Sequence, residues 1–373
     1  MVSTFKMNYL FSFVLAFHYL CNMKEYVNEA VELLKQLIAI PSVSREETAA
    51  ADLLEERIHE YGIKPQREGN NIWALSENFD TSLPTVLLNA HIDTVRPVKS
   101  WTMEPFRPFM QDGKLYGLGA NDCGGGLVSP LQVFRILKDL SDINLVYLAS
   151  AEEEVSGKDG ISRVLPLLPK IDVAIVGEPT AMQPAVAEKG LMVLDITARG
   201  KSGHAARNEG VNAIYEALDA LHWFRSYQFE RVSPFLGATQ MQVTVINAGT
   251  QHNVVPDECC MVVDVRTNEL YTNKEVFDII EAHVKSEVKA RSFRLGSSHI
   301  DVEHPLIRKC VAMGMVPFGS PTLSDQAQMS FPSFKLGPGY SSRSHSADEY
   351  ICISEIEEAI HQYVTLLRDV KLV

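Results

Sequence analysis

The sequence lacks the excess of basic residues that a nucleic-acid partner requires. Its 34 lysines and arginines stand against 47 aspartates and glutamates, which gives a formal net charge of -13. Binding to phosphate backbones needs a basic surface, so we expect no nucleic-acid partner. Internal repeats and low-complexity tracts are also missing, and a chain with 46% hydrophobic and 22% charged residues has the composition of a folded globular protein.

Cysteine is scarce, and the hydrophobic runs are short. The six cysteines have neither the spacing of a disulfide scaffold nor that of a zinc finger, so we expect a reducing, cytoplasmic location. The apolar run from Tyr9 to Cys21 is too short to cross a membrane, and we expect no membrane partner. It also lacks a small-residue cleavage site. We interpret Met23 as the true start and residues 1–22 as a mis-assigned start or an unstructured leader, with a signal peptide as the alternative.

With 373 residues the chain exceeds the usual size of a single core, which predicts two domains. After an amphipathic helix at Met23, helical patterns alternate with strand-like runs at 85–89, 144–148 and 173–176. This alternation is typical of an α/β domain with a mixed, mostly parallel sheet. It returns after residue 302, so we predict a discontinuous catalytic domain made of residues 23–186 and 303–373.

The segment between these two parts has a different order of elements. Residues 187–302 read as a strand, a helix, two strands, a helix at 274–288 and a strand at 293–300, which resembles a ferredoxin-like α+β domain. We therefore predict that 187–302 is an inserted lid or dimerisation domain.

Imidazole and carboxylate groups follow the predicted strand ends and a Gly-rich turn. A single carboxylate at such a place is more often a cap or a solvated residue than a metal ligand. Many of them at one sheet edge would repel each other unless a cation lay among them. Nitrogen and oxygen ligands suit zinc, with cobalt or manganese as alternatives. The candidates are His91, Asp93, Asp122, Glu153, Glu154, Glu178 and His345.

Two imidazoles and several carboxylates are enough for two ions that share a bridging carboxylate. Glu153 and Glu154 are adjacent, so one could bind metal while the other transfers protons. Asp93 could accept the imidazole N–H of His91 and fix its tautomer, or it could cap a turn. For Cys123, the role of a small buried hydrophobe is the simpler interpretation.

The motifs NAHIDTV, GLGANDCGGG, SAEEEVSG, VGEPT and SRSHSADEY, in this order, resemble the M20 metallopeptidase family from Met23 to the C-terminus. The sequence is most similar to the branch of acetylornithine deacetylases and succinyl-diaminopimelate desuccinylases. This resemblance implies that His91 and Glu178 bind one metal ion and that Glu154 and His345 bind the other. It also implies that Asp122 bridges the two ions.

The resemblance assigns further roles in catalysis. Glu153 would be the general base, with Asp93 orienting the metal-binding imidazole; Glu152 aligns with the Asp of the family's Asp-Glu-Glu pattern. The family's inserted domain usually dimerises, and His204 would reach across the dimer to stabilise the oxyanion. One departure is that the family often has a Lys after the bridging Asp, where this chain has Cys123 and three glycines.

Three residues resemble the family's substrate contacts. Asn253 and Arg266 would bind the substrate's carboxylate, for which the planar guanidinium is well suited. A surface salt bridge is the alternative for Arg266. Gly337 would belong to a backbone turn around the substrate.

The resemblance implies a metal-dependent hydrolase that cleaves the amide bond of a small N-acyl amino acid. The leading hypothesis is deacetylation of N2-acetylornithine, or of N-succinyl-ornithine or N-acetylcitrulline, in arginine biosynthesis. The alternatives are a succinyl-diaminopimelate desuccinylase, or a dipeptidase or aminoacylase of the same family. A different class, a catalytically inactive binding homologue, should have lost ligands or the base, and the sequence keeps all of them.

Overall fold

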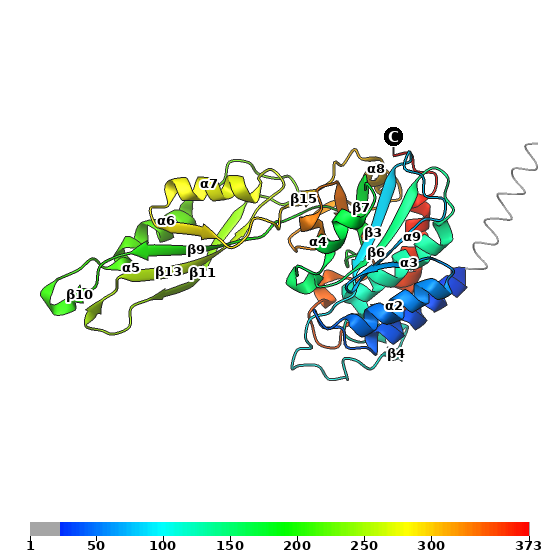
Figure 1. The fold of residues 1–373 in the computed structure, drawn as a ribbon, viewed down its shortest axis with the longest axis horizontal. Helices are drawn as coiled ribbons and strands as arrows, with labels where there is room; N and C mark the ends of the chain where they lie inside the picture. The colour runs from blue at the N-terminus through cyan, green and yellow to red at the C-terminus, as the bar shows by residue number, and fades with distance from the viewer. Residues whose placement is uncertain (1–22, 373) are drawn as a thin grey trace, which may run out of the picture. The chain divides into compact units, whose positions relative to one another are not determined.

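A computed structural model describes residues 23–372, and the chain divides into two compact units (Figure 1). The first unit runs to Pro184 and resumes at Glu303–Val316 and from Lys335 onward, and the second comprises Ala185–Val302 and Pro317–Phe334. The predicted boundaries differ at residues 317–334, because β16 (Phe318–Ser320) pairs with β8 (Ala185–Glu188) of the second unit. Residues 1–22, on which the predicted leader falls, lie outside the described residues. Within residues 23–372, no helix is long and apolar enough to cross a membrane.

The first unit is built on a mixed sheet in which three central strands run parallel. β3 pairs in parallel with both β6 and β7, whereas β1 and β2 form an antiparallel edge. His91 lies beside Ser150, and Asn89 lies beside Val176. The segments that follow these strands therefore leave the sheet at one edge. The order is β1 (Gln66–Glu68), β2 (Asn71–Leu75), β6 (Asn144–Ser150), β3 (Thr85–His91), β7 (Val173–Val176) and β17 (Ser333–Lys335).

Helices cover this sheet with their apolar sides. The predicted amphipathic helix is confirmed: residues 23–38 are helical and Val27, Leu34 and Leu37 are buried. The main helix of the sheet, α3 (Gly125–Leu137), packs on β3 and β6 and on α9. The other helices are α2 (Thr48–Glu60), α4 (Ile161–Val164), α8 (Pro305–Ala312) and α9 (Ile353–Leu367). A small separate sheet has the order β18 (Tyr350–Cys352), β5 (Lys114–Tyr116) and β4 (Phe109–Gln111).

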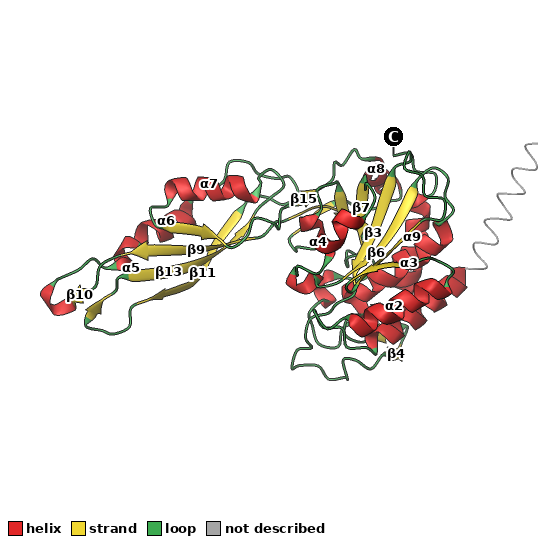
Figure 2. Cartoon of the chain, in the orientation of Figure 1, coloured by secondary structure: helices red, strands yellow, loops and turns green. Residues whose placement is uncertain are grey.

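The second unit contains a four-stranded antiparallel sheet with helices packed on it (Figure 2). Leu194, Ile196 and Val263 point from the strands into a core that Val276 and Ile280 of α7 complete. The strand order is β11 (Gln240–Ala248), β13 (Glu258–Arg266), β9 (Met192–Arg199) and β14 (Glu287–Ala290). The helices are α5 (Ala213–Glu216), α6 (Leu218–Ser226) and α7 (Asn273–His283), and the short strands are β10 (Gly203–His204), β12 (Val254–Val255) and β15 (Ser298–His299).

One predicted boundary in this unit is wrong. The helix expected at 274–288 ends at His283, and the strand expected at 293–300 is not the fourth strand of the sheet. That strand is β14, in which partly buried Val288 and Ala290 alternate with exposed residues. This period of two allows β14 to pair with β9.

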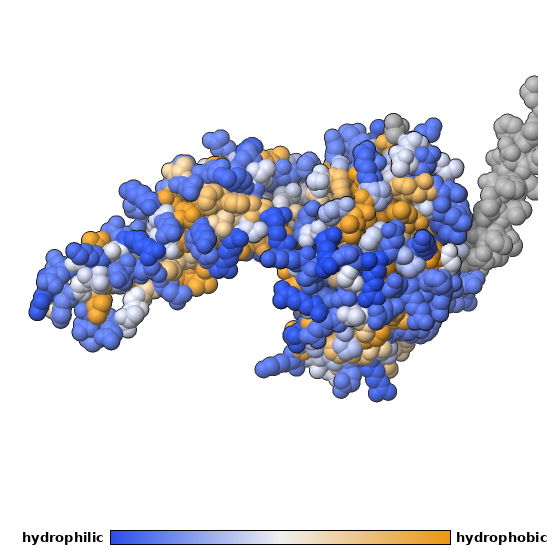
Figure 3. All heavy atoms as spheres, viewed as in Figure 1, coloured by the Kyte–Doolittle hydropathy of each residue, from blue (hydrophilic) through white to orange (hydrophobic). Residues whose placement is uncertain are grey.

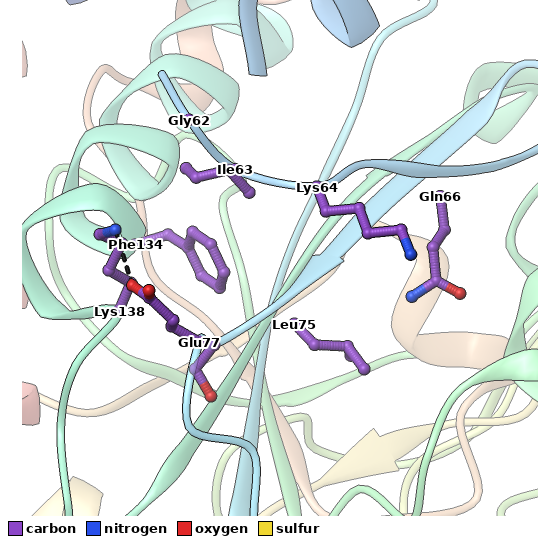
Figure 4. Close-up of a pocket in the computed structure, with 9 residues that line it drawn as sticks. Gly62, Ile63, Lys64, Gln66, Leu75, Glu77, Phe134 and Lys138 are labelled. Atoms are coloured by element: carbon purple, nitrogen blue, oxygen red, sulfur yellow. Dashed lines mark hydrogen bonds and ion pairs between the residues drawn. The ribbon is translucent and has the colours of Figure 1, made fainter. Parts of the chain in front are cut away.

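A cavity of about 510 Å³ lies in the first unit (Figure 4). It lies beside Leu75, which pairs with Val146 near the start of β6, so it is at the opposite end of the sheet from the predicted ligands. An ion pair of 2.8 Å between Lys138 and Glu77 lies at its edge. None of the predicted site residues lines this cavity.

Candidate metal centre

His91 ends the parallel strand β3, and its imidazole points at two carboxylates. Its Nε2 atom lies 3.3 Å from Oδ1 of Asp122 and 3.9 Å from Oε1 of Glu178. The imidazole is only 1% exposed. Glu178 follows β7, the neighbour of β3 in the sheet, so strand pairing sets the spacing of these two groups.

His345 faces the other side of the same aspartate. Its Nε2 atom lies 3.0 Å from Oε2 of Glu154 and 3.7 Å from Oδ2 of Asp122. The two oxygens of Asp122 therefore face different imidazoles, which is the arrangement required of a carboxylate that bridges two ions. The His345 side chain is 56% exposed, whereas Glu154 beside it is only 8% exposed, so solvent reaches this half of the site at His345; we call it the exposed half and the His91 half the buried half.

The donor atoms converge closely enough to hold metal ions. Ligand atoms of His91, Asp122 and Glu154 lie within 4.8 Å of one another, and so do those of His91, Cys123 and Glu178. The chemistry of the donors, imidazole nitrogen and carboxylate oxygen, suits zinc and similar divalent ions. Cys123 is buried, as expected of a small hydrophobe, and its thiol also lies beside this set; its Sγ donates to the Gly177 carbonyl at 3.0 Å.

The crowded acidic groups of the site favour the binding of a cation. Burial raises the pKa of Glu178 to about 7, and the neighbouring Asp122 acts in the same direction, against the opposing effect of Lys335. Burial disfavours the protonated form of His91, yet Cys123, Asp122 and Asp93 raise its pKa well above the usual range. Without metal ions, bound protons therefore reduce the repulsion within this crowded set of acids. Bound divalent ions would replace those protons.

Asp93 holds both the imidazole and the acidic turn. Nδ1 of His91 lies 2.9 Å from the backbone oxygen of Asp93 and 3.5 Å from its Oδ1, so an N–H on Nδ1 leaves Nε2 free to bind a metal. The carboxylate of Asp93 accepts the backbone N–H groups of Glu153 and Glu154 at 3.0 and 3.2 Å and the Ser44 hydroxyl at 2.6 Å. The sequence predicted the first contact but not the other three.

Two close backbone approaches near the candidate ligands require glycine. A Cβ on Gly126 would lie 1.5 Å from the Gly177 carbonyl oxygen, and one on Gly337 would lie 2.4 Å from the Glu178 carbonyl oxygen. The peptide bond between Asp122 and Cys123 is cis. The glycines therefore let the chain segments of several ligands lie in direct contact.

Four predicted residues belong to the second unit or have other partners. His204, Asn253 and Arg266 belong to the second unit, where Arg266 forms a two-point ion pair with Asp264. Gly337 is in the first unit, and its N–H donates to the Thr180 hydroxyl at 3.1 Å. Their roles toward substrate stay predictions.

Sequence reasoning missed a buried glutamate near the C-terminus. Glu349 accepts backbone N–H groups of the turn that carries Asp122, and burial raises its pKa to about 8. It lies in the motif SRSHSADEY, four residues after His345, and this proximity was the only signal in the sequence.

Comparisons with known proteins match both units. The model described as a peptidase dimerisation domain, M20_dimer, matches residues 186–292, and the model of peptidase family M28 matches residues 71–168. The acetylornithine deacetylase of Proteus mirabilis strain HI4320 is 29% identical over 361 residues, which cover 88% of this chain and 93% of that protein. The succinyl-diaminopimelate desuccinylase of Delftia acidovorans is 28% identical over 254 residues, which cover 62% of this chain and 66% of that protein.

Solved structures share the fold. The aminopeptidase PepT from Bacillus cereus has a TM-score of 0.74 at 20% identity, covering 93% of this chain and 98% of its own. A dinuclear metal-binding peptidase of the M20 family from Bacillus subtilis has a TM-score of 0.69 at 16% identity, covering 92% of this chain and 98% of its own. Together with the converging ligands, these matches show that the chain is a metal-dependent amidohydrolase that carries a peptidase dimerisation domain and is similar to the M20 peptidases.

Proposed function

We propose that this enzyme hydrolyses the amide bond of a small N-acyl amino acid and that its substrate is N2-acetylornithine. The observation that carries the choice of substrate is coverage: the acetylornithine deacetylase relative matches 88% of this chain, whereas the desuccinylase from Delftia matches 62%. N-succinyl-ornithine and N-acetylcitrulline are substrates of the same chemistry. A desuccinylase is the second candidate, supported by the relatives named for that activity.

The proposed cofactor is a pair of divalent ions, with zinc favoured over cobalt and manganese by the nitrogen and oxygen donors. His91 and Glu178 would hold one ion, Glu154 and His345 the other, and Asp122 both. When bound, the pair polarises the amide carbonyl and lowers the pKa of a water molecule.

The protein's own groups would carry out the proton transfers. Glu153 would remove a proton from the attacking water molecule while the oxygen of that water forms a bond to the amide carbon. The same carboxyl would then give the proton to the nitrogen as the carbon–nitrogen bond breaks, which releases the acid and the free amine. The contact between the Glu153 N–H and Asp93 supports this role, because it fixes the base beside the ligand Glu154.

The second unit would contribute to binding and to the oxyanion. His204 would donate to the oxygen that becomes negative in the tetrahedral intermediate, while Asn253 and Arg266 would bind the substrate's carboxylate. In the family these contacts accompany dimerisation, and the matched dimerisation domain supports a homodimer.

The surface of the second unit also supports a homodimer. Val245 and Ile246 of strand β11 are 44% and 50% exposed, and Tyr215 and Leu218 near the start of α6 are 68% and 53% exposed. Hydrophobic side chains are visible among hydrophilic ones on the face of this unit shown in Figure 3. Exposed large hydrophobic side chains are often found at interaction surfaces.

The test is amine release from a panel containing N2-acetylornithine, N2-succinylornithine, N-acetylcitrulline, succinyl-diaminopimelate and Ala-Ala, with zinc or cobalt added. The Glu153→Gln variant serves as the control for contaminating activity. We expect metal-dependent release from N2-acetylornithine. Cleavage of Ala-Ala alone would refute the deacetylase assignment, and no cleavage of any compound would favour the inactive-homologue hypothesis.

A further inference from the structure

Two of the three proposed ligands on the exposed half of the metal centre, Asp122 and His345, come from distant parts of the chain. Asp122 lies in a turn just before α3, whereas His345 lies in a loop just before β18. His91 and Glu178, on the buried half, instead follow two strands that are paired directly. The exposed half therefore needs other contacts to hold its ligands at a fixed separation.

Glu349 supplies the first of these contacts. It is 2% exposed and has no role in the mechanism above. Its Oε1 atom accepts the backbone N–H groups of Asn121 and Asp122 at 2.7 and 2.9 Å, and its Oε2 atom accepts that of Gly119 at 3.2 Å. A buried carboxyl group whose two oxygens accept three backbone N–H groups holds the turn at three points, and burial strengthens each of these hydrogen bonds.

Asn121 supplies the second contact. Its side-chain amide donates to the Tyr340 carbonyl at 3.1 Å and to the Ser344 hydroxyl at 3.4 Å, and its Oδ1 accepts the Tyr340 N–H at 3.0 Å. These bonds connect the residue before Asp122 to the segment that ends directly before His345. The turn of Asp122 is thus joined to the loop of His345 at two places, once before and once after His345.

We propose that Glu349 and Asn121 are positioning residues that set the distance between Asp122 and His345 and thereby the affinity for the ion on the exposed half. This inference rests on the proposed two-ion centre. The buried half depends less on these residues, because pairing of β3 with β7 holds His91 and Glu178 independently. Loss of either contact should therefore weaken one ion more than the other.

The test compares Glu349→Ala and Asn121→Ala with the parent protein by calorimetric titration of zinc into metal-free protein and by the visible absorption of bound cobalt. We expect the parent to bind two ions per chain. Both variants should keep one ion with nearly parental affinity and bind the second about 10- to 100-fold more weakly, the usual effect of losing an outer-shell partner.

Asp348 provides a matched control. It is the neighbour of Glu349 and also accepts three hydrogen bonds, from the N–H and hydroxyl of Thr102 and the N–H of Met103, in a loop without predicted ligands. Asp348→Ala should therefore bind both ions as the parent does.

The outcomes separate the inference from its premise. A parent protein that binds fewer than two ions refutes the two-ion centre itself. Parental affinity for both ions in Glu349→Ala and Asn121→Ala overturns the positioning role. Equal weakening of both ions also overturns it, as does the same effect in Asp348→Ala. If Glu349→Ala does not fold, the same zinc and cobalt titrations of Asn121→Ala and of the conservative Glu349→Gln test the positioning role.

Discussion

Replacing Glu178 by glutamine should stabilise the metal-free protein at pH 8 and destabilise the metal-loaded protein. The reason is the pKa of Glu178, which burial raises from its ordinary value of 4.5 to about 7. A carboxyl whose pKa is higher in the folded than in the unfolded state binds more protons when folded. Its ionisation therefore lowers the free energy of unfolding as the pH rises from about 4.5 to about 7.

The size of the effect follows from that difference. Each pH unit between the folded and unfolded pKa corresponds to about 1.4 kcal/mol, so ionised Glu178 costs the metal-free fold about 3 kcal/mol at pH 8. At pH 5 most of the folded protein keeps the proton, and the cost is below about 1 kcal/mol. Glutamine has a similar shape and no charge, so it removes the cost at pH 8.

Urea unfolding with a chelator present measures this directly. With a slope of about 3 kcal/mol per molar, the midpoint for Glu178→Gln should exceed that of the parent by about 1 M at pH 8. The two midpoints should nearly coincide at pH 5. Excess zinc should reverse the order at pH 8, because binding to the folded state stabilises the parent more than a variant that lacks a ligand. A difference that is the same at both pH values, or a less stable metal-free variant at pH 8, would refute the reasoning.

Glu153→Gln should lower turnover by about 100- to 10,000-fold and leave the metal content unchanged by elemental analysis; loss of metal would instead identify Glu153 as a ligand. Asp122→Ala should lose both ions, because its two oxygens face the two imidazoles, and retention of two ions would contradict the bridging role. His204→Ala should lower turnover by about 100- to 1,000-fold with metals retained, and unchanged turnover would exclude it from catalysis. Gly126→Ala should lower the free energy of unfolding by about 3 kcal/mol, because the added Cβ would overlap the Gly177 carbonyl. An unchanged melting temperature would show that the backbone can move to accommodate it.

The convergence of the candidate ligands could be predicted because each follows a feature that is visible in the sequence. His91 and Glu178 come after strongly hydrophobic runs, and parallel strands bring such positions to one edge of a sheet. Asp122 follows a Gly-rich turn. The division into an α/β part and an inserted part was also visible, because the order of strand-like and helical runs changes near residue 187 and changes back after residue 302.

The residues that hold these ligands in place could not be predicted. Glu349 contacts Asn121 across 228 positions of sequence, and its bonds go to backbone N–H groups that every residue other than proline carries. Neither periodicity nor residue type reports such a contact. The misplaced strand β14 has a related cause, since its four residues are too few to separate a period of two from the end of a helix.

The second unit is inserted in the chain between the fourth and fifth proposed ligands. During translation, the fifth proposed ligand is therefore synthesised only after the second unit. His91, Asp122, Glu154 and Glu178 all precede residue 185, whereas His345 follows the whole inserted segment. During synthesis, the buried half of the metal centre has all its ligands before the second unit begins to emerge. The exposed half lacks a proposed ligand until His345 has been made, so the synthesis of the second unit separates the times at which the two proposed ligand sets become complete.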